Sequence, residues 1–492
     1  MRGEEVDTEP AEQLAGPDAA ANVLGRGSRY TVATLIQVVA GILIIPLLTR
    51  TVDPEEYGTI TAALVVQTVF GTAAAVGCQA SISRTYFRRH GPEGARALIG
   101  VTALAAVAFA VLAELTGPLW SGVFEGLDYG APLRLAVLQV VPVAVLVGAV
   151  TFLQAAGRVR AYVITVALAT PGAQGLGLVV ALLHGGAVGY LAGVTAGLYV
   201  AMIFAWLAAV IDFGPLRPRS GGRDLLRGAA WVALPTIPSS LALYVLSAGD
   251  RIVVEGLEGL SAAGAYYIAY AVGSLGIFLV TALNNAWGPI LFGTEEETRW
   301  SLMADSAVEV TRVVALVGAA LAIGAPIALE LFAPSDYDLA GLGTVSALVA
   351  VSGLPYLWYI TSYNIVVWRG RTGILGLATP ICVAVNLGLC ALLIPPLGLE
   401  GAALATLIAY GLLAFLTWLR SRSLAPVPWD LRALSLAASP AIGGLAIALA
   451  LPDHGAWLVI RGLVAAGLGL YGLALLTASH RIGVRRPAAS AT

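Results

Sequence analysis

Long apolar blocks separated by short polar segments run from about residue 29 to residue 478. A block of roughly 20 apolar residues can cross the hydrocarbon core of a bilayer as a helix. Lipid offers the backbone no hydrogen-bonding partner, so such blocks must be helical. Splitting the chain at charged residues, prolines and glycines predicts an all-α integral membrane protein with fourteen transmembrane helices. Their ranges are 29–49, 57–79, 97–115, 133–155, 162–183, 188–211, 228–248, 263–286, 310–331, 341–366, 373–394, 401–419, 434–451 and 457–478.

The basic residues lie mainly at alternate ends of these helices. All 27 are arginines, and if the N-terminus is cytoplasmic all but four lie at cytoplasmic helix ends. The exceptions are Arg50, Arg134 and Arg251 at outer ends and Arg461 within the last helix. Short cytoplasmic loops of membrane proteins carry an excess of Arg and Lys. The pattern therefore predicts that both termini are cytoplasmic.

The chain contains an internal duplication. Arg158 matches Arg369 within similar short segments, and the same offset places Thr195 on Thr406. Six helices per copy is an even number, so we expect two parallel six-helix lobes with a site at their interface. The predicted division is a disordered cytoplasmic tail (1–28), a first lobe (29–211), a cytoplasmic inter-lobe loop (212–227), a second lobe (228–420), two additional transmembrane helices (421–478) and a cytoplasmic tail (479–492).

The composition of the chain excludes several classes of function. Only 11% of residues are charged, against roughly 25% in soluble proteins. The net charge of −2 gives no electrostatic support for binding nucleic acid. Without lysine the chain cannot have the P-loop of an ATPase. The four histidines and three cysteines show no metal-ligand spacing. We therefore expect no enzyme activity, no metal and no cofactor.

Polar side chains within the helices predict a central cavity, because polar groups at membrane depth should face protein or water. Such a cavity, partly lined by tyrosines, would suit a hydroxyl-rich ligand. The pattern also fits ordinary hydrogen bonding between helices and an aromatic belt at the membrane interface. The candidate lining residues are Gln37, Thr236, Ser240, Tyr244, Tyr270, Asn284 and Asn285.

Four arginines are candidates for binding an anionic headgroup such as a pyrophosphate. Arg50 and Arg251 each close the first helix of a lobe, so pseudo-symmetry should bring them near the central axis. Arg84 and Arg88, at a cytoplasmic end, would draw the headgroup in. The alternative for Arg50 and Arg251 is a structural salt bridge to Asp53, Glu55, Glu56 or Asp250. Arg461 is shallow enough to extend its charge to the membrane surface.

Several segments resemble the polysaccharide transport (oligosaccharide flippase) family. The segment 44–58 (IIPLLTRTVDPEEYG) resembles its opening signature, and 282–289 (ALNNAWGP) and 397–406 (LGLEGAALAT) are also similar. The likeness covers about 28–419. It implies two six-helix lobes forming a V, as in the multidrug/oligosaccharidyl-lipid/polysaccharide exporter superfamily. It also implies alternating access that moves a polyprenyl-diphosphate-linked oligosaccharide from the inner to the outer leaflet of a bacterial plasma membrane.

Two other branches of this superfamily provide alternatives. A drug/cation antiporter usually places acidic residues in the helices of its first lobe, and the first two predicted helices contain none. A lipid II flippase also has fourteen helices, so helix number does not separate it from a glycan-unit flippase. The expected partners are the lipid-linked oligosaccharide, membrane lipids, and the glycosyltransferases and polymerase of polysaccharide synthesis.

Overall fold

The computed structural model describes residues 41, 43–75, 78–86, 91–123, 129–209, 222–233, 237–293, 295–333, 341–369, 371, 373 and 375–482. Every regular element in these ranges is a helix. The first group comprises α2 (Pro54–Ala75), α3 (Cys78–Tyr86), α4 (Gly91–Leu115), α5 (Gly117–Trp120), η2 (Ser121–Val123), α6 (Ala131–Ala155), α7 (Val159–Ala167), η3 (Leu168–Gly172), α8 (Ala173–His184) and α9 (Gly186–Ala209). The second comprises α10 (Gly222–Ala233), α11 (Ile237–Glu258), α12 (Leu260–Gly293), α13 (Glu296–Phe332), α14 (Leu342–Trp368), α15 (Leu375–Leu397), α16 (Leu399–Ser421), α17 (Leu431–Ala450) and α18 (Ala456–Ile482).

Twelve stretches in the described residues are long and apolar enough to cross a membrane. They coincide with twelve of the fourteen predicted helices. The first predicted helix, 29–49, falls mostly outside the described residues. The seventh, 228–248, overlaps α11, which continues to Glu258. The prediction ended this helix before Asp250 and Arg251 because charges usually mark a helix end, whereas the fold gives both residues partners inside the second lobe.

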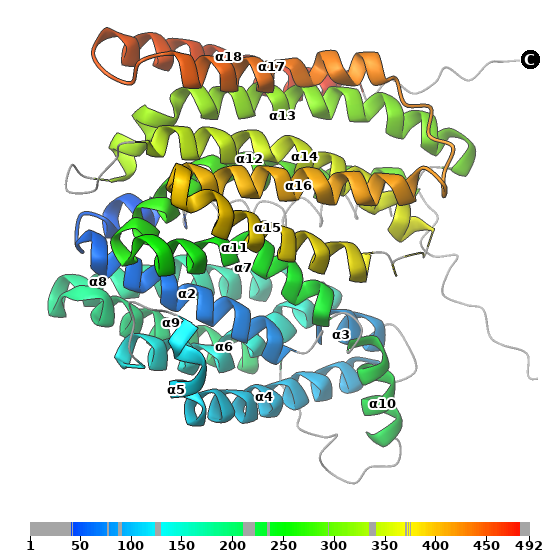
Figure 1. Cartoon of the computed structure of the whole chain (residues 1–492). Coiled ribbons are helices and arrows are strands. Elements are labelled where there is room, and N and C mark those ends of the chain that lie inside the picture. Colours follow the sequence, from blue (N-terminus) through cyan, green and yellow to red (C-terminus); the bar gives the residue numbers. More distant parts are fainter. Residues whose placement is uncertain are drawn as a thin grey trace, which may run out of the picture.

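The two lobes repeat one packing scheme, which confirms the predicted pair of like bundles. In the first, α6 packs against α2, α4 and α9, and α8 packs against α9. In the second, α14 packs against α12, α13 and α16, and α15 packs against α16. Figure 1 shows the blue and cyan helices of the first lobe below the yellow-green and orange helices of the second. The residue boundaries of the two lobes are still a prediction from the sequence.

The hairpin of α17 and α18 lies on the outer side of the second lobe against α13 (Figure 1). Arg461 is only 3% exposed, so it does not extend to the surface as predicted. Its guanidinium donates to the carbonyls of Pro452 (3.1 Å), Ala448 (2.8 Å) and Ile323 (3.3 Å). The last turn of a helix has carbonyls without partners and carries partial negative charge. Arg461 satisfies these groups at the end of α17 and joins the hairpin to α13.

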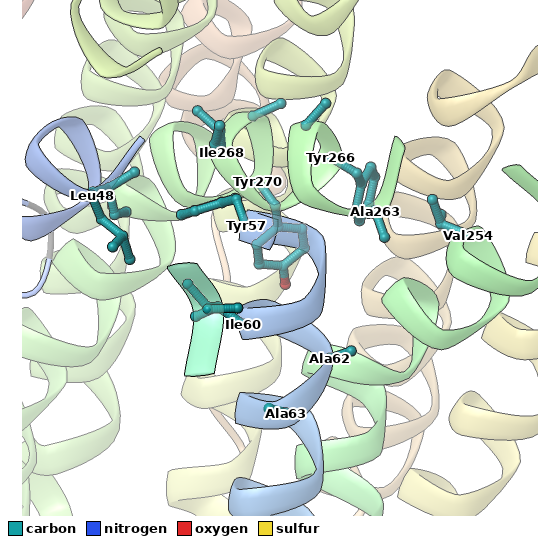
Figure 2. Packing of buried hydrophobic residues seen from close by; sticks show 14 of the residues in the cluster. Leu48, Tyr57, Ile60, Ala62, Ala63, Val254, Ala263, Tyr266, Ile268 and Tyr270 are labelled. Carbon is teal, nitrogen blue, oxygen red and sulfur yellow. The ribbon is translucent and has the colours of Figure 1, made fainter. Parts of the chain in front are cut away.

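The lobes meet through α2, which packs against α11 and α12. We call the closest region the α2–α12 seam, formed by Pro54–Gly58 and Leu260–Tyr267. The rings of Tyr57 and Tyr267 meet edge to face with centroids 5.9 Å apart. Figure 2 shows Tyr57 and Ile60 on α2 beside the buried face of α12. The seam thus forms a continuous apolar core between the lobes.

Candidate functional site

A cavity of about 390 Å³ lies on the face of the first lobe, next to the second. Its walls come from α2, α3, α6, α7, η3, α8 and α9, and Tyr244 of α11 contributes from the second lobe. Along α2 the lining begins at Leu64, six residues after the seam glycine Gly58. A helix rises about 1.5 Å per residue, so the cavity starts about 9 Å beyond the seam. The seam therefore lies beyond the end of the cavity marked by Leu64.

The cavity lining is polar but neutral. Amide and hydroxyl side chains interrupt its apolar wall, and no aspartate, glutamate, arginine or histidine is among the described residues that line it. The polar members are Gln67, Thr68, Thr72, Gln79, Tyr162, Thr170, Gln174, Tyr190 and Tyr244. Each amide offers donors and an acceptor, and each hydroxyl offers both. Such a lining can bind a ligand rich in hydroxyls without paying the desolvation cost of a buried charge.

A π-helical turn shapes one wall of this cavity. The segment η3 contains Pro171 and lies between α7 and α8. Proline has no backbone N–H and clashes with the carbonyl four residues earlier, and a π-turn accommodates it by widening the helix. Such turns often occur at functional sites. Thr170 of this turn and Gln174 of the next both line the cavity. The Oε1 atom of Gln174 is buried and has no hydrogen-bond partner among the described residues.

A second hollow, of about 500 Å³, lies among α13, α14, α16 and α17. Its lining is mainly apolar and includes Trp358, Phe415 and Trp418. None of the described residues that line it belongs to the first lobe. A transported headgroup needs polar contacts and access to both lobes, so we assign the candidate site to the neutral cavity.

The predicted cavity residues lie in different parts of the structure. Tyr244 lines the cavity. Tyr270 is instead 5% exposed inside the second lobe. Asn284 accepts a hydrogen bond from Nδ2 of Asn364 (2.8 Å), so it joins two helices of that lobe. The predicted residues that lie outside the described residues, or whose side chains do, are Gln37, Thr236, Arg88, Ser240, Asn285 and Arg84.

Arg50 and Arg251 have different surroundings. Arg50 is exposed and donates to two backbone carbonyls, those of Pro46 (2.5 Å) and Leu331 (3.0 Å). Arg251 lies inside the second lobe, where its guanidinium carbon is 4.5 Å from the ring centroid of Tyr267 and 5.0 Å from that of Tyr270. A cation over the face of an aromatic ring is stabilised by the ring quadrupole. The structure thus shows aromatic and carbonyl partners for these two arginines.

Asp250 forms the centre of a polar cluster in the second lobe. Its carboxylate is fully buried and accepts hydrogen bonds from the hydroxyls of Tyr266 (2.7 Å) and Thr406 (3.2 Å) and from the backbone N–H of Arg251 (3.0 Å). Elsewhere, on α15, Asn386 is also fully buried, and neither polar atom of its side chain has a hydrogen-bond partner among the described residues. The described residues contain no group of three or more His, Cys, Asp or Glu side chains placed to bind a metal.

Most of the cavity residues are not among those predicted from the sequence. Gln67, Thr68 and Thr72 lie within a largely apolar predicted helix. Thr68 and Thr72 are four residues apart and so share a face of α2. Gln174 follows Pro171 within three residues, and a proline next to a buried amide could have marked the π-turn. The spacing of these polar residues was therefore a usable signal.

Comparisons with known proteins support a transporter fold. Residues 25–295, more than half of the chain, match the family described as "Polysaccharide biosynthesis protein". No curated protein matches the sequence significantly.

Solved structures of the same fold include three transporters. The lipid II flippase MurJ, in an inward closed conformation, has 13% identity and a TM-score of 0.65, covering 92% of this chain and 99% of that one. A multidrug resistance MATE family transporter of the MOP superfamily, facing inward, has 18% identity and a TM-score of 0.62, covering 82% and 96%. A MOP superfamily transporter from Pyrococcus furiosus has 18% identity and a TM-score of 0.59, covering 88% and 100%.

Proposed function

Because the chain belongs to the polysaccharide biosynthesis protein family, we propose that it is a flippase for a polyprenyl-diphosphate-linked oligosaccharide. It would carry this lipid from the inner to the outer leaflet of a bacterial plasma membrane, with both termini in the cytoplasm. The observation that carries the proposal is the neutral cavity of about 390 Å³ lined by glutamine, threonine and tyrosine side chains.

The chemistry of this lining suits sugars better than cationic drugs. Ligand sites generally combine an apolar wall with a few convergent polar groups. Sugar hydroxyls both donate and accept, as do the side chains of Gln67, Gln174 and Tyr244. A cationic drug held in a site of low dielectric constant would need a carboxylate nearby, and the described lining has none. This favours a glycan carrier over a drug/cation antiporter.

The proposed cycle is a rocking motion of the two lobes. The sugar headgroup would enter the cavity between the lobes while the polyprenyl tail stays in the lipid, and the lobes would then part at the α2–α12 seam. Arg84 and Arg88 remain candidates for attracting the diphosphate from the cytoplasm. The buried carboxylate of Asp250 could couple this motion to a proton or a small cation, because its charge would depend on the bound ion.

Proteoliposomes containing a fluorescent polyprenyl-diphosphate oligosaccharide provide the test. An impermeant quencher or glycosidase added outside reports which leaflet holds the sugar. We expect transfer between leaflets well above that of protein-free vesicles, and transfer equal to that background would refute the proposal. Lipid II replaces the substrate in a parallel arm, and transfer of lipid II alone would indicate a lipid II flippase. Exchange of a proton or sodium gradient for a cationic drug would indicate an antiporter.

A further inference from the structure

Two glycines face each other across the α2–α12 seam. A Cβ atom on Gly58 would overlap the carbonyl oxygen of Leu260. A Cβ atom on Gly264 would lie 2.9 Å from the carbonyl oxygen of Pro54 and 3.0 Å from the backbone nitrogen of Gly58. In both cases the obstacle is backbone, which cannot rotate away as a side chain could. The two helices therefore reach this distance only because both positions lack a side chain.

This contact joins the lobes, unlike most glycine contacts in the protein. Gly71 lies on the same helix as Gly58, but its neighbour is Val143 of α6 within the first lobe. Gly256, on α11, has nothing within 4 Å of the position of a Cβ atom. The requirement for glycine at Gly58 and Gly264 thus comes from the approach of the lobes and not from the packing of either lobe.

Two side-chain hydrogen bonds also join the lobes next to the seam. The hydroxyl of Thr49 donates to the carbonyl oxygen of Phe332 at 2.6 Å, and Nη2 of Arg50 donates to that of Leu331 at 3.0 Å. Both carbonyls belong to the last turn of α13, where they have no partner within the helix. The partial negative charge of a helix C-terminus also favours a guanidinium there. Breaking these bonds is necessary before the end of the first predicted helix can move away from α13.

We propose that Gly58 and Gly264 are the gating residues of the outer seam and that Thr49 and Arg50 form its latch. The size of the residue at the two glycine positions sets the ratio of closed to open seam. The latch stabilises the closed state, because opening the seam would break its hydrogen bonds and expose the two carbonyl groups to water. This proposal rests on the alternating motion in the proposed function, and it holds for any substrate.

Electron–electron distance measurements between spin labels test the gate without substrate. Labels at His184→Cys and Leu397→Cys report the separation of the lobes, because these exposed residues end α8 and α15. The three buried native cysteines are first replaced by alanine. We expect the parent to show a short distance, and Gly58→Ala and Gly264→Ala to show a longer one. Overpacking of a closed contact should lower the closed-to-open ratio roughly 5- to 150-fold.

Three further variants separate gating from folding. Gly256→Ala should keep the parent distances, and Gly71→Ala should keep them even if its thermal stability falls. Thr49→Val preserves the shape of the side chain but removes one hydrogen bond, so the closed-to-open ratio should fall about fivefold. If one glycine variant fails to fold, the other glycine variant and Thr49→Val still test the proposed gate. Parent-like distances in every folded variant among Gly58→Ala, Gly264→Ala and Thr49→Val would overturn the gate, whatever the flipping assay shows.

Discussion

The glutamines of the cavity provide the sharpest test of substrate binding. Gln67 on α2 and Gln174 on α8 both line the neutral cavity. Replacing either with leucine keeps most of the side-chain volume and removes its donors and acceptor. A hydrogen bond between neutral groups contributes about 1 kcal/mol net, which is about fivefold in an equilibrium constant. The KM for the lipid-linked sugar should therefore rise about fivefold in each variant.

The double variant makes the prediction stricter. The two residues lie on different helices, and substitutions without a shared partner are additive within about 0.5 kcal/mol. We expect Gln67→Leu/Gln174→Leu to raise KM about 25-fold. The assay is initial flipping rate against substrate concentration in proteoliposomes. Gln154→Leu, an exposed glutamine at the end of α6, is the control and should leave KM unchanged. An unchanged KM in both single variants and the double variant would show that the sugar does not bind in this cavity.

Three further substitutions test the structure itself. Arg461→Met should lower the free energy of unfolding by about 2–3 kcal/mol, because it removes charged hydrogen bonds to carbonyls at the end of α17; an unchanged melting temperature would contradict the buried arginine. Asn284→Leu should lower the free energy of unfolding by about 1–3 kcal/mol, because it leaves the amide of Asn364 unpaired. The double variant Asn284→Leu/Asn364→Leu should recover part of that loss. Equal melting temperatures for the parent, the single variant and the double variant would refute the pair. Glu296→Gln should lower the free energy of unfolding by less than about 1 kcal/mol. The ion pair between Glu296 and Arg369 is 2.7 Å long, but the two side chains are 54% and 31% exposed, so water screens it. A larger loss in a melting experiment would show that the pair is shielded from water.

Most of the fold could be predicted because the length and hydrophobicity of membrane helices identify them in a sequence. Twelve predicted helices have counterparts in the described residues. The misplaced one, α11, shows the limit of this logic. Asp250 and Arg251 resemble a helix end in the sequence, but Tyr266, Tyr267 and Thr406 come from other parts of the chain to satisfy them. No local pattern reveals partners so distant in sequence.

The candidate site was harder to predict for a related reason. Tyrosines and asparagines dominate the polar stripes of the second lobe, but they bond within that lobe. Asn284 pairs with Asn364, and Tyr270 pairs with Tyr410. Gln67 and Gln174 lie in more apolar stretches, and only the fold shows that both face the same cavity. A polar residue in a membrane helix must face protein or water, and sequence alone does not tell which.

The two copies of the duplicated bundle have therefore diverged in charge. Thr195 and Thr406, which the duplication matches, each donate to the carbonyl four residues earlier, at 2.7 Å and 3.2 Å. Thr195 also accepts a hydrogen bond from the neutral amide of Gln139. The single hydroxyl proton of Thr406 is instead shared between the Ala402 carbonyl and the carboxylate of Asp250, each 3.2 Å away. The same position thus serves a neutral network beside the cavity in one lobe and an ionic cluster in the other. In the function we propose, the sugar binds against the first lobe, whereas the buried carboxylate of Asp250 lies in the second. The α2–α12 seam joins these two regions of the protein.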